Sequence, residues 1–179
     1  MTASARRGVR VRPATPADLA SVVELRLALL REHADSPLYA NLRADASDRA
    51  RRLFAAQLAS TSERIFLAEG ESGVVGIIRC VESMGSPLLE PQRYGYVSSA
   101  YVRPDARRRG TLRALVAAAR EWCVARGLEE MRLHSVAGDP ASNAAWDALG
   151  FPVVEHMRRS PVADSDQPPA GPRPPRARR

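Results

Sequence analysis

The sequence predicts one α/β (α+β) domain, in which a mixed β-sheet carries helices on both faces. Its 179 residues are 45% hydrophobic and 26% charged, which is the balance of a single globular domain of ordinary size. Short β-branched runs alternate with amphipathic segments in the order β-α-α-β-β-β-α-β-α-β. Strand–helix–strand units need crossover connections, and these connections place helices against the faces of the sheet.

The first half of the chain predicts one strand and two helices. Residues 9–12 alternate apolar and basic side chains, as a half-buried strand does. Residues 15–18, Thr-Pro-Ala-Asp, supply a cap, a proline for the first turn and an early acid, so a helix is expected over 19–33. A second helix is expected to open at residues 47–48, with its apolar stripe between 53 and 58.

The second half predicts a hairpin, a third strand of the same sheet and two further helices. A Glu-Gly-Glu-Ser-Gly turn separates two β-branched runs, and the helix after the third strand is strongly amphipathic and ends at a glycine. The expected elements are strands at 65–68, 74–81 and 94–102, a helix at 111–126, a strand at 131–136, a helix at 140–149 and a last strand at 153–158.

Both ends of the chain differ in composition from its centre. We expect residues 1–8 to be a flexible leader, 9–159 to be the folded domain and 160–179 to be a disordered tail, because the tail has six prolines and no apolar periodicity. The net charge is +7, and removing the +2 contributed by each end leaves +3 for the domain. This value argues against nucleic acid as the main partner, although an anion-binding role for the tail stays open.

Other sequence features narrow the class of protein. The chain has no run of 18 apolar residues and no secretory signal, so we expect a cytoplasmic protein without a membrane partner. Cys80 and Cys123 stand in apolar stretches, and the three histidines are far apart, so no metal site is expected.

The junction at residues 101–112, YVRPDARRRGTL, carries the clearest chemical signal. A strand runs into a proline, and a basic turn then leads into a helix that begins near Gly110 or Thr111. Free N–H groups at a helix start, the helix dipole and three flanking arginines favour a phosphate group, and a glycine lets the backbone approach it. Arginine triplets also occur in plain solvated turns, so the junction alone leaves both interpretations open.

The chain resembles the GNAT superfamily of acetyl-CoA-dependent N-acyltransferases. That family's pyrophosphate loop, Gln/Arg-x-x-Gly-x-Gly/Ala, is similar to residues 107–112. The likeness continues in VRPATPADL at 11–19, VVG at 74–76 and ALGF at 148–151, in the family's order. It implies a centrally splayed sheet, in which acetyl-CoA enters between the fourth and fifth strands, and no metal.

The resemblance also implies the residues that bind acetyl-CoA. Backbone groups of the fourth strand would meet the pantetheine arm, loop amides would hold the pyrophosphate, and an Asp or Asn before or within the last helix would contact the arm. These residues are Ala100, Tyr101, Val102, Arg107, Arg108, Arg109, Gly110, Thr111, Leu112, Arg113, Asp139 and Asn143. Leu112 departs from the family's glycine or alanine, which predicts weaker binding of the cofactor.

No catalytic residue follows securely from the resemblance. Trp146 stands where many members have a tyrosine acid, and an indole keeps its proton, so Trp146 is either a core residue or packs on the cofactor. Ser98 and Ser99 stand where a carboxylate base is frequent. The weak candidates are Glu82, Glu90, Ser99 and Trp146, with His134 as a further possible base.

The acceptor pocket of the family is formed by two loops, here residues 33–45 and 83–93. Tyr39, Asp35, Glu32 and Glu90 in or beside them could hold a cationic amine. The expected function is transfer of an acetyl group from acetyl-CoA to a primary amine of a small molecule or peptide, by a monomer or homodimer. The alternatives are a catalytically degenerate domain that binds an acyl-CoA or a partner, and an RNA-associated acyltransferase.

Overall fold

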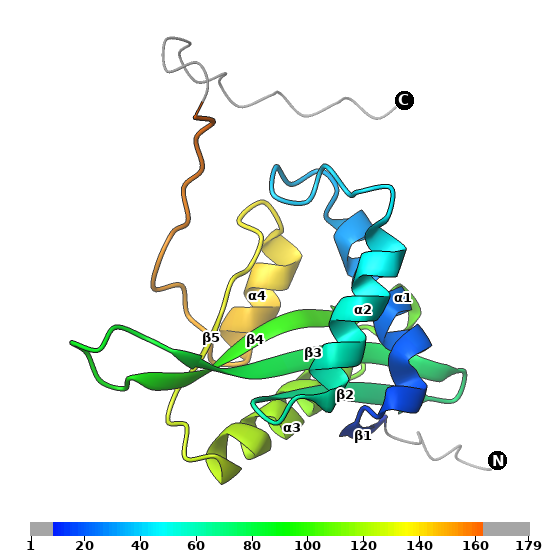
Figure 1. Ribbon diagram of the computed structural model, residues 1–179, viewed down its shortest axis with the longest axis horizontal. Coiled ribbons are helices and arrows are strands. Elements are labelled where there is room, and N and C mark those ends of the chain that lie inside the picture. The colour runs from blue at the N-terminus through cyan, green and yellow to red at the C-terminus, as the bar shows by residue number, and fades with distance from the viewer. Residues whose placement is uncertain (1–8, 163–179) are drawn as a thin grey trace, which may run out of the picture.

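The computed structural model describes residues 9–162 and contains a five-stranded sheet with strand order β1-β2-β3-β4-β5 (Figure 1). The strands are β1 (Arg10–Pro13), β2 (Glu63–Gly70), β3 (Gly73–Met84), β4 (Arg93–Val102) and β5 (Met131–Leu133). The helices are α1 (Leu19–Glu32), α2 (Ala46–Ala59), α3 (Thr111–Ala125) and α4 (Pro140–Ala148), with short 3-10 turns at Pro16–Asp18 and Pro104–Ala106. The mixed α/β architecture expected from the sequence is confirmed.

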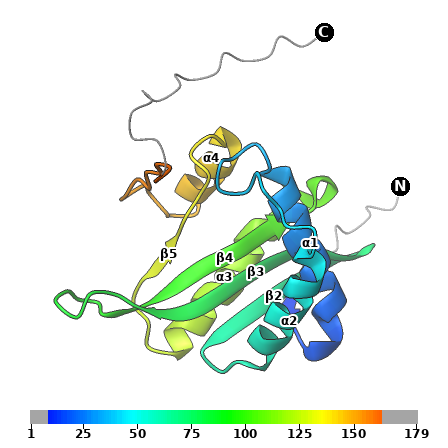
Figure 2. The ribbon, with the colours of Figure 1, turned by 45° about the horizontal axis from the view of Figure 1, so that its top comes forward.

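Helices cover both faces of the sheet. Strands β1 to β4 pair antiparallel, whereas β4 and β5 pair parallel. Helices α1 and α2 lie on one face, where Leu25 and Phe54 pack on Ile77 of β3; α3 lies on the other, where Leu115 packs near Ile78 (Figure 2). Neighbouring residues of β3 therefore point into two separate cores, as the alternation of a strand requires.

The prediction of a last strand at residues 153–158 is wrong. This segment pairs with no strand among the described residues and leads away from the sheet (Figure 1, orange). Val153 is 60% exposed and Val154 90% exposed, so the alternating apolar pattern has no second surface to bury it. β5 is three residues long, half the expected length. The β2–β3 hairpin is confirmed and is tighter than expected, because both strands extend into the predicted turn.

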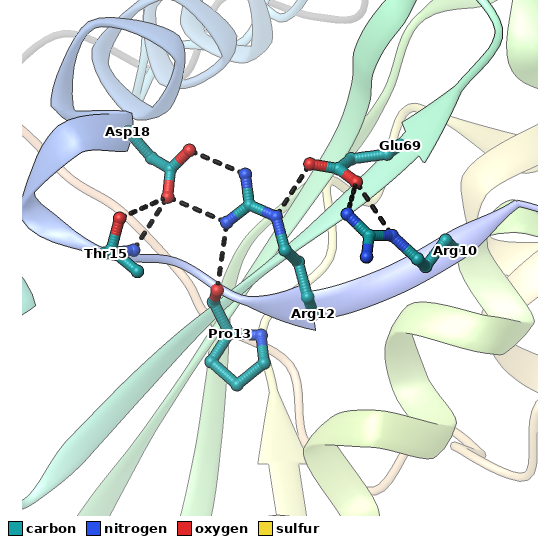
Figure 3. Close-up of polar contacts among 6 residues, drawn as sticks. All are labelled: Arg10, Arg12, Pro13, Thr15, Asp18 and Glu69. Carbon is teal, nitrogen blue, oxygen red and sulfur yellow. Dashed lines mark hydrogen bonds and ion pairs between the residues drawn. The ribbon is translucent and has the colours of Figure 1, made fainter.

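A charged network joins β1 to the start of α1 (Figure 3). The Arg12 guanidinium donates to both oxygens of Asp18 at 2.8 Å and to Glu69 at 2.7 Å. Asp18 also accepts from the backbone N–H and the hydroxyl of Thr15, at 2.8 and 2.9 Å. The hydrogen bonds from Arg12 hold the pKa of Asp18 well below its usual range. No helix within residues 9–162 has the length and apolar character that crossing a membrane requires.

Candidate active site

β4 and β5 part in the middle of the sheet. Only three residue pairs join them, the last being Val97 with Leu133, so the β5 side of β4 is open from residue 98 onward within the described chain. A bulge lies at the same point: the pairing of β4 with β3 shifts register opposite Ile78, and Ser99 has a φ of 53°. A bulge bends the strand that carries it, so the gap is built into β4 rather than left by a missing neighbour (Figure 2).

The loop that follows β4 ends in a left-handed glycine. Gly110 has a φ of 83° and caps α3, and a Cβ added there would meet no atom within 4 Å. Arg108 also has a positive φ, 57°. Within residues 9–162 the backbone N–H groups of residues 108–113 donate no hydrogen bond, although the N–H of Ala114 reaches the Gly110 oxygen at 3.0 Å. Successive unpaired amides at a helix start form a cradle for an anion.

The side chains around this cradle have different functions. Arg107 is tied into the fold: its Nε donates to the Val102 oxygen at 2.8 Å and its Nη2 contacts the Glu32 carboxylate at 2.6 Å. Thr111 is buried and donates to the Ala106 oxygen at 2.9 Å. Leu112 packs against the core on the α3 face, so its side chain does not fill the cradle. The exposed arginines available to a phosphate are Arg108, Arg109 and Arg113.

An open strand edge and a row of unpaired amides can bind an extended ligand that carries a phosphate group. Ala100 and Tyr101 lie on the open part of β4, whereas the Val102 oxygen is already occupied by Arg107. Leu112 was expected to weaken binding of the cofactor. Its side chain packs against the core, so the main reason for that expectation no longer applies.

Asp139 and Asn143 hold the start of α4 in place. An Asp139 oxygen accepts from the Ser142 N–H at 3.0 Å, which caps the helix. The Asn143 amide donates to the Val136 oxygen at 3.0 Å and its carbonyl accepts from the Ser135 hydroxyl at 2.6 Å. Both side chains thus fix the segment that borders the gap on the β5 side.

Trp146 is a core residue. It is 8% exposed and its ring meets Phe151 edge-on at 5.5 Å, within the cluster that α3 packs against. The structure favours this interpretation over stacking on a cofactor.

Neither glutamate proposed as a base suits that function. Glu82 is held between Arg126 and Arg93, at 2.9 and 2.6 Å, and these hydrogen bonds lower its pKa. Glu90 is exposed and lines a hollow with Gly127 and Glu129, beside the C-terminal end of α3. The 15 residues of α3 span roughly 22 Å, so both acids lie at the opposite end of this helix from Gly110.

A tyrosine–histidine pair stands where the strands part. The Tyr96 hydroxyl lies 2.8 Å from His134 Nδ1, and His134 directly follows the last paired residue of β5. Burial raises the pKa of Tyr96. The sequence suggested His134 but not Tyr96. The available signal was strand alternation, which places Tyr96 and Ser98 on one face of β4. Ser99 is buried within the bulge, and the Ser98 hydroxyl accepts from Arg79 at 3.0 Å.

The acids expected to hold a cationic amine are not gathered in the structure. Glu32 pairs with Arg107, Glu90 lies at the far end of α3, and Asp35 is exposed. Tyr39 is half-buried near the His33 ring, at 6.1 Å between ring centres. A separate hollow of about 600 Å³ lies between α1 and the end of β4, where Glu24 and Arg103 form an ion pair at 2.6 Å.

The fold is shared with acetyltransferases of known structure. The family model described as "Acetyltransferase (GNAT) family" matches residues 27–151, and the chain belongs to this family. Its members are acyltransferases, so the protein is an enzyme of that class.

Individual relatives agree with this assignment. The chain is 32% identical to an aminoglycoside N(6')-acetyltransferase type 1 from Stenotrophomonas maltophilia, over 82% of this chain and 88% of that protein. A GCN5-related N-acetyltransferase structure from Ralstonia eutropha JMP134 is 25% identical with a TM-score of 0.71, covering 88% of this chain and 100% of that one. A predicted acetyltransferase from Clostridium acetobutylicum, solved with acetyl-CoA, shares the fold at 16% identity, a TM-score of 0.71, and 86% and 96% coverage.

Proposed function

We propose that the protein transfers the acetyl group of acetyl-CoA to the primary amine of a small molecule, in the cytoplasm. The observation that carries this proposal is the open edge of β4, which runs from Ser98 to the unpaired amides of residues 108–113. An extended pantetheine arm would lie along that edge with its pyrophosphate in the cradle. The aminoglycoside acetyltransferase relative supports a small-molecule acceptor.

Residues of this chain would hold the donor in two places. The amides at the start of α3, with Arg108, Arg109 and Arg113, would bind the pyrophosphate. The β4 backbone at Ala100 and Tyr101 would pair with the amide groups of the pantetheine arm, as a sheet edge pairs with an added strand. Acetyl-CoA itself supplies the acyl group, activated as a thioester.

The Tyr96–His134 pair supplies proton transfer. When the ring proton sits on Nδ1 and is donated to the Tyr96 oxygen, His134 Nε2 is left to accept the proton of the attacking amine, directly or through water. The amine nitrogen then forms a C–N bond to the acetyl carbon while the C–S bond breaks. The departing CoA thiolate takes up one proton, and the amine loses one, so the reaction has no net gain or loss of protons.

The first test is a thermal-shift titration with acetyl-CoA and CoA, followed by detection of released thiol with a panel of amines. A ligand that binds only the native state raises its stability, so saturating cofactor gives a shift of several degrees. Thiol release that depends on an amine supports the proposal. Unchanged melting at millimolar ligand contradicts it.

A second candidate, a domain that binds acyl-CoA without catalysis, is favoured by one observation. β4 carries no carboxylate, since its sequence is RYGYVSSAYV. A thermal shift without any thiol release would select this candidate.

A further inference from the structure

One half-buried arginine lacks a carboxylate partner. Within residues 9–162, five arginines have intermediate exposure, and four of them form ion pairs. The paired ones are Arg12, Arg79, Arg103 and Arg126, with Asp18, Glu63, Glu24 and Glu82 respectively. Arg26, on α1, has neither an ion pair nor a side-chain hydrogen bond to any described residue. Partly buried guanidinium groups are normally paired, so this one is unusual.

Arg26 lies on the helix that packs on β4, the strand whose open edge borders the gap. The strand register places Arg79 of β3 and Tyr96 of β4 on the face of the sheet that α1 and α2 cover. Tyr39 follows in the α1–α2 loop, near the ring of His33 at the end of α1. Tyr96 is also the partner of His134. Burial, followed by the neighbouring Arg79, lowers the pKa of Arg26, which remains a cation at neutral pH.

Nearby acids are already engaged elsewhere. Arg79 is held by Glu63 and by the Ser98 hydroxyl, so that pair contributes no net charge. The two acids of α1, Glu24 and Glu32, pair with arginines of the loop after β4. On the α1 side of β4, the positive charge of Arg26 therefore has no carboxylate partner among the described residues.

We propose that Arg26 binds an anionic group of the acceptor, so that the substrate class is an amine that also carries a carboxylate or a phosphate. This inference rests on the proposed function and specifies its acceptor. A guanidinium forms a bidentate pair with either group, and the Tyr39 hydroxyl can donate a further hydrogen bond. The acceptor amine would then be placed toward His134. A polycationic acceptor such as an aminoglycoside would meet an unpaired positive charge and be disfavoured.

The test compares amines that differ only in the anionic group. Tyrosine against tyramine tests the carboxylate, phosphoethanolamine against ethanolamine tests the phosphate, and an aminoglycoside represents polycations. Thiol release is measured for the unaltered protein, Arg26→Gln and Arg26→Lys, with Arg31→Gln as the control. Arg31 is an exposed arginine of the same helix and forms no ion pair with any residue in 9–162.

We expect the anionic member of at least one pair to have the higher kcat/KM. Arg26→Gln should raise its KM by about 10- to 100-fold, the range of a lost charge-assisted hydrogen bond, with little change in kcat. Arg26→Lys should retain part of the preference, and Arg31→Gln all of it. The KM for the member without the anionic group should not change in any variant.

Preference for polycationic amines or for amines without an anionic group, or equal KM changes in Arg26→Gln and Arg31→Gln, would overturn the inference. The inference would also be overturned if the protein binds CoA in calorimetry but acetylates none of the anionic amines. If the protein does not bind CoA at all, the proposed function is overturned instead. The anion site is then tested by calorimetric titration of the anionic amines into the unaltered protein and into Arg26→Gln. Loss of binding in the variant supports the anion site, whereas equal binding to both proteins, or no binding to either, rejects it.

Discussion

Gly95 occupies a place in β4 where no side chain fits. A Cβ there would overlap the Cys123 sulfur of α3 and lie 3.2 Å from the Cys80 sulfur of β3, and both thiols are buried, 3.4 Å apart. Gly95→Ala should lower the free energy of unfolding by about 1–3 kcal/mol, because the core must shift to accept one methyl group. Gly138→Ala is the control, since its Cβ would meet no atom within 4 Å. Equal denaturation midpoints for the two variants would contradict this packing.

Gly110 offers a test of the anion cradle. Gly110→Asp should weaken CoA binding by at least about 10-fold, because a carboxylate beside the pyrophosphate adds like-charge repulsion. Gly127→Asp is the matched control: its φ is 67°, its surroundings are equally open, and it lies at the other end of α3. Calorimetry should give a raised Kd for the first variant alone. An equal rise in the Kd for CoA in both variants would mean that backbone strain, and not the anion cradle, causes the weaker binding.

His134 is expected to act in the chemical step and not in binding the donor. His134→Gln should lower kcat by about 10²-fold or more, the usual contribution of a general base, with the Kd for CoA unchanged. Tyr96→Phe should leave CoA binding intact and displace the pH profile of kcat. The exposed His156 provides a control in His156→Gln, which should match the unaltered enzyme. A kcat for His134→Gln within twofold of that enzyme would remove the proton-transfer assignment.

At the level of elements, the entry into α1 depends on Arg12. Arg12→Met should lower the free energy of unfolding by about 1.5–3 kcal/mol at pH 7, because it removes charge-assisted hydrogen bonds to Asp18 and Glu69. The folded pKa of Asp18 is depressed, so its contribution is present above its unfolded pKa and is lost as the pH falls through the folded value. Urea denaturation should therefore show that the difference in unfolding free energy between Arg12→Met and the unaltered protein becomes smaller toward pH 2. Arg43→Met, which breaks an exposed pair with Asp45, should change little at any pH.

Local rules predicted the elements whose causes are local. The Thr15–Asp18 cap and the glycine that ends α3 at residue 127 follow from neighbours in sequence, and both lie where expected. The prediction of a strand at 153–158 was wrong, because burial of its valines would need a neighbouring strand that the sequence cannot show. The anion cradle was predictable for the same local reason. Arg26 and Tyr96, 70 positions apart in sequence, come to the same side of the sheet only through the tertiary fold.

At the scale of the whole molecule, the sheet divides unequally at the gap. β5 is joined to β4 by three residue pairs, and the segment beyond it reaches the core mainly through Trp146 and Phe151. Amides of β5 and α4 should exchange with solvent faster than those of β2 and β3. Saturating CoA, which would touch both sides of the gap, should slow exchange in β5 and α4. Hydrogen exchange with and without CoA measures this, and uniform protection across the sheet would contradict it.

The bulge at Ser99 has a consequence for the energetics of the unliganded enzyme. β4 and β5 lack hydrogen bonds to each other beyond Val97, which leaves the free protein less stable than a fully paired sheet would be. In the proposed site the donor would supply hydrogen bonds to β4 when it binds. We therefore expect β5 and α4 to open more readily than the rest of the sheet until a ligand couples them to β4. Mutations that loosen the smaller unit should be tolerated far better in cells rich in CoA than in cells depleted of it.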